Sequence, residues 1–185
     1  PVHFAKGGRT MEQIPIAEWI GPAVRLDVTV QCAKDPDYLL SIADVEAWEK
    51  LHGRIPAGAW VVMYTGVDTR HYPDRRKVLG TEKTGPEAVA ELHFPGFSPE
   101  VAEWLIRERD IRGIAIDTPS IDRGQSKDFK VHQVICGADR LAMEQIAGCA
   151  RLPDAGATRY VIPMMIAQGT GAPARVFAWV PGGRK

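Results

Sequence analysis

The residues of this chain best suited to chemistry are His132 and Glu144, which flank the apolar run VICGADRLAM, and His3, close to the first residue. An imidazole nitrogen and a carboxylate oxygen together suit Zn²⁺ or Mn²⁺. Residues 133–143 separate the pair, far more than one helical turn spans, so a strand–turn–strand or helix–strand unit must fold back to join them. From spacing alone, a buried His132 that only hydrogen-bonds its neighbours and an ion-paired structural Glu144 remain the alternatives.

A second polar group lies in the stretch DTPSID, where Asp117, Ser120 and Asp122 follow a predicted strand. Ligands often bind at this end of a strand in α/β proteins, although Asx turns and helix caps account for the same residue types. The chain has no GxSxG and no Walker A motif. A serine triad of that kind and a P-loop nucleotide site therefore have no support.

The composition is that of a globular protein. The 185 residues include 23 Lys and Arg and 23 Asp and Glu, so net charge gives no reason to expect nucleic acid or a membrane as a partner. No apolar stretch reaches the roughly 18 residues of a membrane span. The three cysteines, Cys32, Cys136 and Cys149, are widely spaced and indicate free buried thiols, which favours a reducing, cytoplasmic location.

Hydrophobic patterns indicate an α/β fold with a mixed β-sheet and flanking helices. Ser41 to Asp44 resembles a capping box that opens a helix ending near Gly53, and Ser98-Pro99 predicts a helix through about Arg109. Strands are expected at residues 24–32, 59–65, 113–117 and 175–180, and strands or strand–loop units at 143–149 and 160–167. Residues 66–95 form a long irregular stretch that we expect to carry function or to pack as a lid.

Four stretches in this order resemble the cyclase family that includes bacterial kynurenine formamidases and isatin hydrolases. They are GAWVVMYTG, HFPGFSPEVAEWLIRERDIRGIAIDTPSIDRG, DFKVHQVICGA and AMEQIAGCARLP. The resemblance runs from Pro1 to about Val180. It implies an α/β fold of the swivelling β/β/α type.

The resemblance also implies roles for single residues. Family members carry His-x-Gly-Thr-His-x-Asp-x-Pro-x-His-Phe, and only its last four positions are present here, as Pro1-Val2-His3-Phe4. By this match His3 is the catalytic histidine and a ligand of a second metal, while His132 and Glu144 belong to the metal site. Relatives often read Glu-Asn-Leu where this chain reads Glu144-Gln145-Ile146.

The absent part of the signature contains the family's principal metal ligands. We therefore expect residues 1–185 to be a single cyclase/hydrolase domain that lacks its N-terminal segment. His3, His132 and Glu144 alone would hold Zn²⁺ or Mn²⁺ weakly. Homo-oligomers, dimers or larger, are also expected from the resemblance.

The function that the resemblance implies is metal-dependent hydrolysis of a small-molecule, non-peptide amide. The substrate would be an aryl formamide such as N-formylkynurenine or a cyclic amide such as isatin, attacked by metal-activated water. Trp60 and Phe94, with Trp19 and Phe97, are candidates for the walls of a pocket for a flat substrate. The alternatives are a non-catalytic, metal-free member of the fold and a cyclase or dehydratase acting on a polyketide-like substrate.

Overall fold

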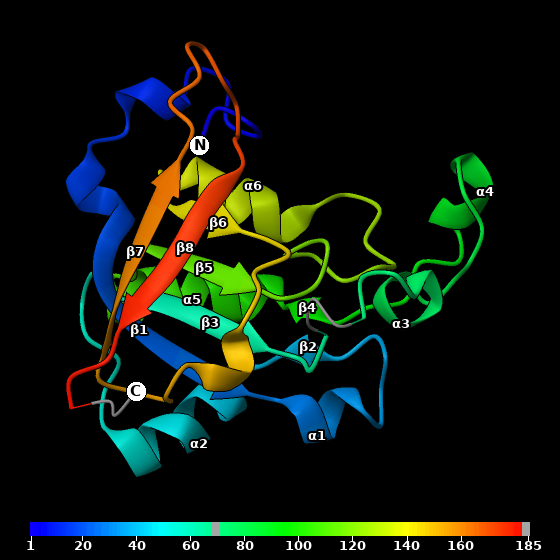
Figure 1. The fold of residues 1–185 in the computed structure, drawn as a ribbon, viewed down its shortest axis with the longest axis horizontal. Coiled ribbons are helices and arrows are strands. Elements are labelled where there is room, and N and C mark those ends of the chain that lie inside the picture. Colours follow the sequence, from blue (N-terminus) through cyan, green and yellow to red (C-terminus); the bar gives the residue numbers. More distant parts are fainter. Residues whose placement is uncertain (68–70, 183–185) are drawn as a thin grey trace.

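The structure is a computed structural model that describes residues 1–67 and 71–182. A six-stranded mixed sheet, in the order β6-β5-β3-β1-β7-β8, forms its centre, and β2 pairs with β4 beside it (Figure 1). The strands are β1 Ile20–Asp27, β2 Leu39–Leu40, β3 Trp60–Tyr64, β4 Gly96–Phe97, β5 Gly113–Ile116, β6 Leu141–Met143, β7 Ala157–Pro163 and β8 Ala174–Trp179. Strands β1, β3, β5 and β6 run parallel, whereas β7 and β8 are antiparallel to their neighbours.

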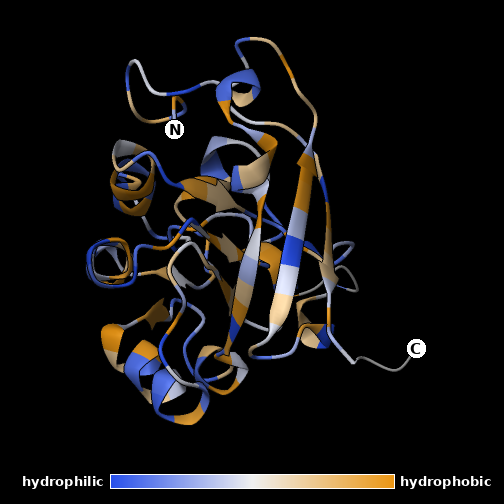
Figure 2. Ribbon diagram, turned by 90° about the vertical axis from the view of Figure 1, so that its left-hand side faces the viewer, coloured by the Kyte–Doolittle hydropathy of each residue, from blue (hydrophilic) through white to orange (hydrophobic). Residues whose placement is uncertain are grey.

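Helices cover one face of this sheet, as the side view in Figure 2 shows. The helices are α1 Thr29–Cys32, α2 Ile42–His52, α3 Arg75–Leu79, α4 Pro86–Val89, α5 Pro99–Arg109 and α6 Lys130–Gly137, with 3-10 turns η1 Met11–Gln13, η2 Ile16–Trp19 and η3 Cys149–Arg151. The two longest helices confirm the sequence prediction. Helix α2 begins at the Ser41 capping box, and α5 begins at Ser98, whose hydroxyl accepts the Val101 N–H.

Alternation along the strands produces two apolar clusters, one on each face of the sheet. Val61 and Met63 of β3 pack with α2, α5 and α6, whereas Trp60 and Val62 face a second cluster that includes Trp19 and Ile14. The α/β prediction with a mixed sheet is therefore confirmed. Among the described residues, no helix has the length and apolar character needed to cross a membrane.

Several observed strands have bounds that differ from those expected; β7, for example, spans Ala157–Pro163, whereas the prediction is 160–167. The strand expected over 24–32 ends at Asp27, because the Asp27 carboxylate accepts the N–H and hydroxyl of Thr29 and turns the chain into α1. The stretch 143–149 is the strand–loop alternative, since β6 ends at Met143 and Gln145 and Gly148 adopt positive φ values of 51° and 78°. The end of each strand is set by local turn chemistry that the hydrophobic pattern does not encode.

The irregular stretch 66–95 leaves the body of the fold and carries the short helices α3 and α4, which lie away from the sheet in Figure 1. Residues 68–70 of this stretch lie outside the described residues. The hydroxyl of Tyr72 donates to the Gln145 carbonyl at 2.7 Å. One part of the stretch is thus joined to the turn after β6. Its expected lid role stays a prediction.

A substitution at Gly113, where β5 packs against β6, tests how tightly the sheet is packed. A Cβ added at Gly113 would meet the Leu141 carbonyl oxygen and lie 2.7 Å from Trp60 Cζ3. We expect Gly113→Ala to lower the free energy of unfolding by about 1–3 kcal/mol, the usual cost of overpacking. Denaturant unfolding provides the measurement.

The matched control is Gly137→Ala at the end of α6, where an added Cβ would have no neighbour within 4 Å. This variant should be neutral or more stable by up to about 1 kcal/mol, because alanine favours a helix over glycine. Equal destabilisation by both substitutions would contradict the packing account.

Candidate active site

The unit β5–α6–β6 creates the site. Because β5 and β6 are parallel, the loop after β5, the start of α6 and the turn after β6 all lie at the same edge of the sheet. His132 is in the first turn of α6, and Glu144 directly follows β6. The helix–strand fold-back, one of the two geometries that the spacing allowed, is therefore the observed one.

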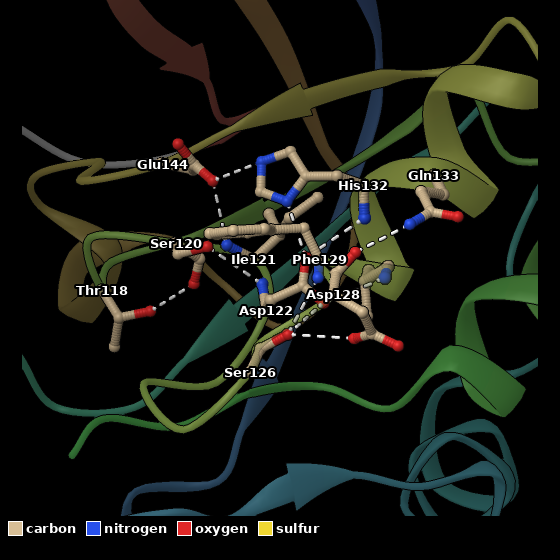
Figure 3. A network of polar contacts seen from close by, with 11 residues as sticks. Thr118, Ser120, Ile121, Asp122, Ser126, Asp128, Phe129, His132, Gln133 and Glu144 are labelled. Carbon is tan, nitrogen blue, oxygen red and sulfur yellow. Dashed lines mark hydrogen bonds and ion pairs between the residues drawn. The ribbon is translucent and has the colours of Figure 1, made fainter. Parts of the chain in front are cut away.

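Asp122 fixes both the helix end and the imidazole ring. Its carboxylate accepts the backbone N–H groups of Val131 at 2.9 Å and His132 at 3.2 Å, which satisfies donors at the start of α6. The same carboxylate lies 2.6 Å from His132 Nδ1 (Figure 3). One buried side chain, 4% exposed, thus orients the histidine.

Glu144 approaches His132 from the other side. Glu144 Oε1 lies 3.1 Å from His132 Nε2 and accepts the Ile121 N–H at 3.0 Å (Figure 3). The neighbouring Gln145 is held in its left-handed conformation by its N–H bond to the Thr118 carbonyl and by the Tyr72 hydroxyl. A non-glycine residue in this conformation is strained, and such strain is typical of functional sites.

The two carboxylates set the charge of the histidine. Burial by itself lowers the pKa of His132, but the hydrogen bonds to Asp122 and Glu144 outweigh it and raise the pKa to about 9. For Asp122, burial raises the pKa, and the bonds from His132 and the α6 backbone more than reverse this, so that the pKa lies below its usual value. At neutral pH, His132 is therefore a buried imidazolium that donates from both ring nitrogens.

His3 lies close to this pair, and within the described residues no hydrogen bond or ion pair joins it to either member. Its ring centre is 6.2 Å from that of His132, and its Nδ1 is 3.2 Å from Thr170 Oγ1. The Phe4 ring packs against both, with its centre 5.1 Å from that of His3 and 4.6 Å from that of His132. The N-terminal residues therefore lie beside His132, and the His3 side chain is exposed.

A cavity of about 720 Å³ joins these residues. His3, His132 and Glu144 line it together with the apolar side chains of Ile14 and Trp19, among others. Its size falls within the range of small-molecule sites. The structure thus brings the three predicted chemical residues to one cavity.

The predicted wall residues Trp60 and Phe94 are not among those that line the cavity. Trp60 is fully buried in the middle of the sheet and stacks behind Trp19, with ring centres 6.2 Å apart. Phe94 is 5% exposed, and its carbonyl accepts the Gly124 N–H in the loop region. Trp19, from the wider set of candidates, is the aromatic that faces the cavity.

The described residues do not by themselves fit a divalent metal. Within residues 1–67 and 71–182, no three His, Cys, Asp or Glu side chains are grouped closely enough to hold an ion. Both ring nitrogens of His132 are already engaged, with Asp122 and Glu144. The chemistry that these residues offer is proton donation and acceptance.

The sequence did not reveal the partnership of Asp122 with His132. In the sequence, Asp122 is one of several oxygen-bearing residues that follow a predicted strand. The chain separates it from His132 by a loop, and neither residue belongs to a local capping motif. No short-range signal could have found this pair, because it depends on how the loop returns to α6.

Residues 1–123 match the family described as "Putative cyclase", and the chain belongs to that family. It is similar to isatin hydrolase of Roseibium aggregatum, at 33% identity over 174 residues, which cover 92% of this chain and 63% of that relative. Kynurenine formamidase of Bordetella petrii is 25% identical over 180 residues, 95% of this chain and 70% of the relative. The chain thus spans under two thirds of the length of the isatin hydrolase relative.

Solved structures show the same fold. Isatin hydrolase A from Ralstonia solanacearum superposes with a TM-score of 0.87 at 34% identity, covering 97% of this chain and 69% of that one. An isatin hydrolase bound to the product analogue thioisatinate superposes with a TM-score of 0.83 at 31% sequence identity. The match covers 93% of this chain and 64% of that one. A structure described as a potential metal-dependent hydrolase with cyclase activity, at 22% identity and a TM-score of 0.64, supports the fold alone.

The pKa of His132 predicts how stability depends on pH. Because the folded pKa, about 9, exceeds the ordinary value of 6.5, His132 contributes stability that is complete below about pH 6.5 and is lost as pH rises through 9. The shift corresponds to roughly 3 kcal/mol. We expect His132→Gln to flatten the alkaline loss of the free energy of unfolding between about pH 7 and pH 10, measured by urea titration.

His93→Gln is the matched control, since His93 also pairs with an aspartate, Asp37, at 2.6 Å, but is largely exposed. Exposed pairs contribute little, so this variant should keep the wild-type slope. An unchanged slope in His132→Gln would show that the imidazolium is not held as described.

Proposed function

We propose that the chain is the catalytic region of a hydrolase that cleaves a small non-peptide amide. The substrate would be an aryl formamide such as N-formylkynurenine or a cyclic amide such as isatin. Two things support this: relatives with those names, and a site with a buried proton donor beside a carboxylate. The observation that carries the proposal is the Asp122–His132–Glu144 arrangement on the cavity.

Glu144 is the candidate base for the attacking water. Its Oε1 is occupied by His132 and Ile121, whereas Oε2 has no hydrogen bond within the described residues. The side chain is 34% exposed and lines the cavity, so a water molecule can reach it. The carboxylate would accept the proton that the water loses as its oxygen bonds to the amide carbon.

His132 is the candidate acid. As an imidazolium it faces Glu144 with its Nε2 proton, so the proton that the amide nitrogen takes up when the C–N bond breaks would pass from His132 through the Glu144 carboxylate, and Asp122 stabilises the imidazolium beforehand. His3, on the same cavity, would assist by taking a proton from water or delivering one to the leaving nitrogen. Trp19 and Ile14 give the cavity an apolar wall that fits a flat ring.

Zn²⁺ or Mn²⁺ remains the prediction drawn from the family resemblance. When bound, such an ion polarises a carbonyl and lowers the pKa of a bound water. Because the described residues do not complete a metal site, the roles above are those of side chains only. Homo-oligomers and a cytoplasmic location also stay predictions.

A metal-free, non-catalytic member of the fold is the alternative from another class. One observation favours it: the two carboxylates beside His132 could have a purely structural role, in which they link α6 to the loop after β5 and to the turn after β6. A cyclase or dehydratase would share the site but would not open isatin or release formate. Absorbance assays with isatin and N-formylkynurenine separate these functions.

Replacing Glu144 tests the proposed base. In the natural protein, Glu144→Gln should lower kcat on the better of the two substrates by about 10²- to 10⁴-fold, with KM changed only a few-fold, since an amide cannot accept the proton. Steady-state kinetics by absorbance provide the measurement. Glu46→Gln, on the exposed face of α2, is the control and should retain full activity.

The metal prediction needs a separate measurement. Elemental analysis of the natural protein should find stoichiometric zinc or manganese, and Glu144→Ala should lose it, because a carboxylate ligand would be absent. Metal content that does not change in Glu144→Ala would remove this residue from the metal site. A protein with neither metal nor turnover would favour the non-catalytic alternative.

A further inference from the structure

Arg159, in the middle of β7, is a buried cation that the proposed chemistry does not use. It is 2% exposed and has no ion pair within the described residues. Its Nη1 is buried without a hydrogen-bond partner, and its Nη2 lies 2.6 Å from the thioether sulfur of Met143. The guanidinium carbon stacks 4.4 Å above the Trp60 ring.

Such an arrangement is costly. A buried charge ordinarily has a carboxylate or several strong acceptors around it, whereas a thioether is only a weak acceptor. Burial lowers the pKa of Arg159 to about 9, which still leaves the guanidinium charged at neutral pH. The group therefore has an unused donor at Nη1 and a positive charge that no carboxylate among the described residues neutralises.

Arg159 lies one layer behind the cavity. Met143, its sulfur contact, lines the cavity, and so does Val161, which points to the same side of β7 two residues further on. Trp19, stacked on Trp60, forms another part of that wall. Because methionine is flexible and unbranched, Met143 can move aside and open a path from the cavity to the guanidinium.

We propose that Arg159 recognises a carboxylate that enters this cavity. A carboxylate would replace the Met143 sulfur as acceptor and could bind the guanidinium through two parallel N–H bonds. This inference rests on the proposed function. Hydrolysis of isatin breaks the ring C–N bond, adds the oxygen of water to the carbon and leaves a carboxylate, while N-formylkynurenine carries one throughout.

The cationic side chains Arg140, Arg175 and His132, which line the cavity itself, are placed differently from Arg159. Arg140 is paired with Asp110 at 2.7 Å, Arg175 is exposed, and His132 lies between two carboxylates. Glu144 carries negative charge at the His132 side of the cavity and repels an anion there. The unneutralised charge of Arg159 thus makes the floor formed by Met143 and Val161 the favourable position.

The experiment compares benzoate with benzamide, which has nearly the same shape but no charge, by calorimetric titration of the natural protein. We expect wild type to bind benzoate at least ten-fold more tightly than benzamide. Arg159→Met should abolish this preference. Arg159→Lys keeps the charge but cannot form two parallel N–H bonds, so it should weaken the affinity for benzoate at least three-fold and leave the affinity for benzamide unchanged.

Arg175→Met is the matched control and should keep the preference for benzoate. The melting temperature of Arg159→Met should equal or exceed that of wild type, because replacing an unpaired buried charge by an apolar side chain removes a cost. If Arg159→Met does not fold, the affinity of Arg159→Lys for benzoate tests the proposal in its place.

An unchanged preference in the Arg159 variants, or its loss in Arg175→Met, would overturn the proposal. So would a wild-type protein with no preference for benzoate. Because the readout is binding, a protein that shows the Arg159-dependent preference but hydrolyses neither amide would contradict the proposed function and leave the carboxylate site standing.

Discussion

The Asp122 carboxylate joins the loop after β5 to the start of α6 and, through His132, to the turn after β6. It accepts two N–H groups at the start of α6 and also orients the His132 ring, whose other nitrogen reaches Glu144 after β6. Without this carboxylate, the first turn of α6 would expose unsatisfied donors, and the buried imidazole would lose the charge that neutralises it. The placement of the site thus depends on one side chain in a loop.

The parallel arrangement of β5 and β6 explains why this loop meets the other two segments. In a parallel pair joined by a helix, the helix begins where the first strand ends, and the second strand ends at the same edge. Charged groups then gather at one edge above a largely apolar sheet. Asp122 and His132 neutralise each other there. Arg159 lies inside the apolar cluster and has no such partner within the described residues, so it is available to a carboxylate that enters the cavity.

The sequence was a good guide to elements and a poor guide to contacts. Helices α2 and α5 and strands β3 and β5 follow from caps and apolar runs, which are local signals. His3, His132 and Glu144 were named by resemblance, and the structure places all three on one cavity. The aromatic ring of Trp60 makes it a candidate for the pocket wall, but the sequence does not indicate whether a tryptophan in a strand faces a cavity or lies beneath another ring. Asp122 and Arg159 gain their roles only from tertiary contacts.

The placement and chemistry of the site depend on the charge state of His132, which nuclear magnetic resonance of the ¹⁵N-labelled imidazole measures. We expect both ring nitrogens of His132 to remain protonated at about pH 7.5, the ring to titrate near pH 9, and Asp122→Asn to move this titration toward the ordinary histidine value. A His132 ring that is neutral at pH 7.5 in the folded wild-type protein would show that the two carboxylates do not stabilise an imidazolium.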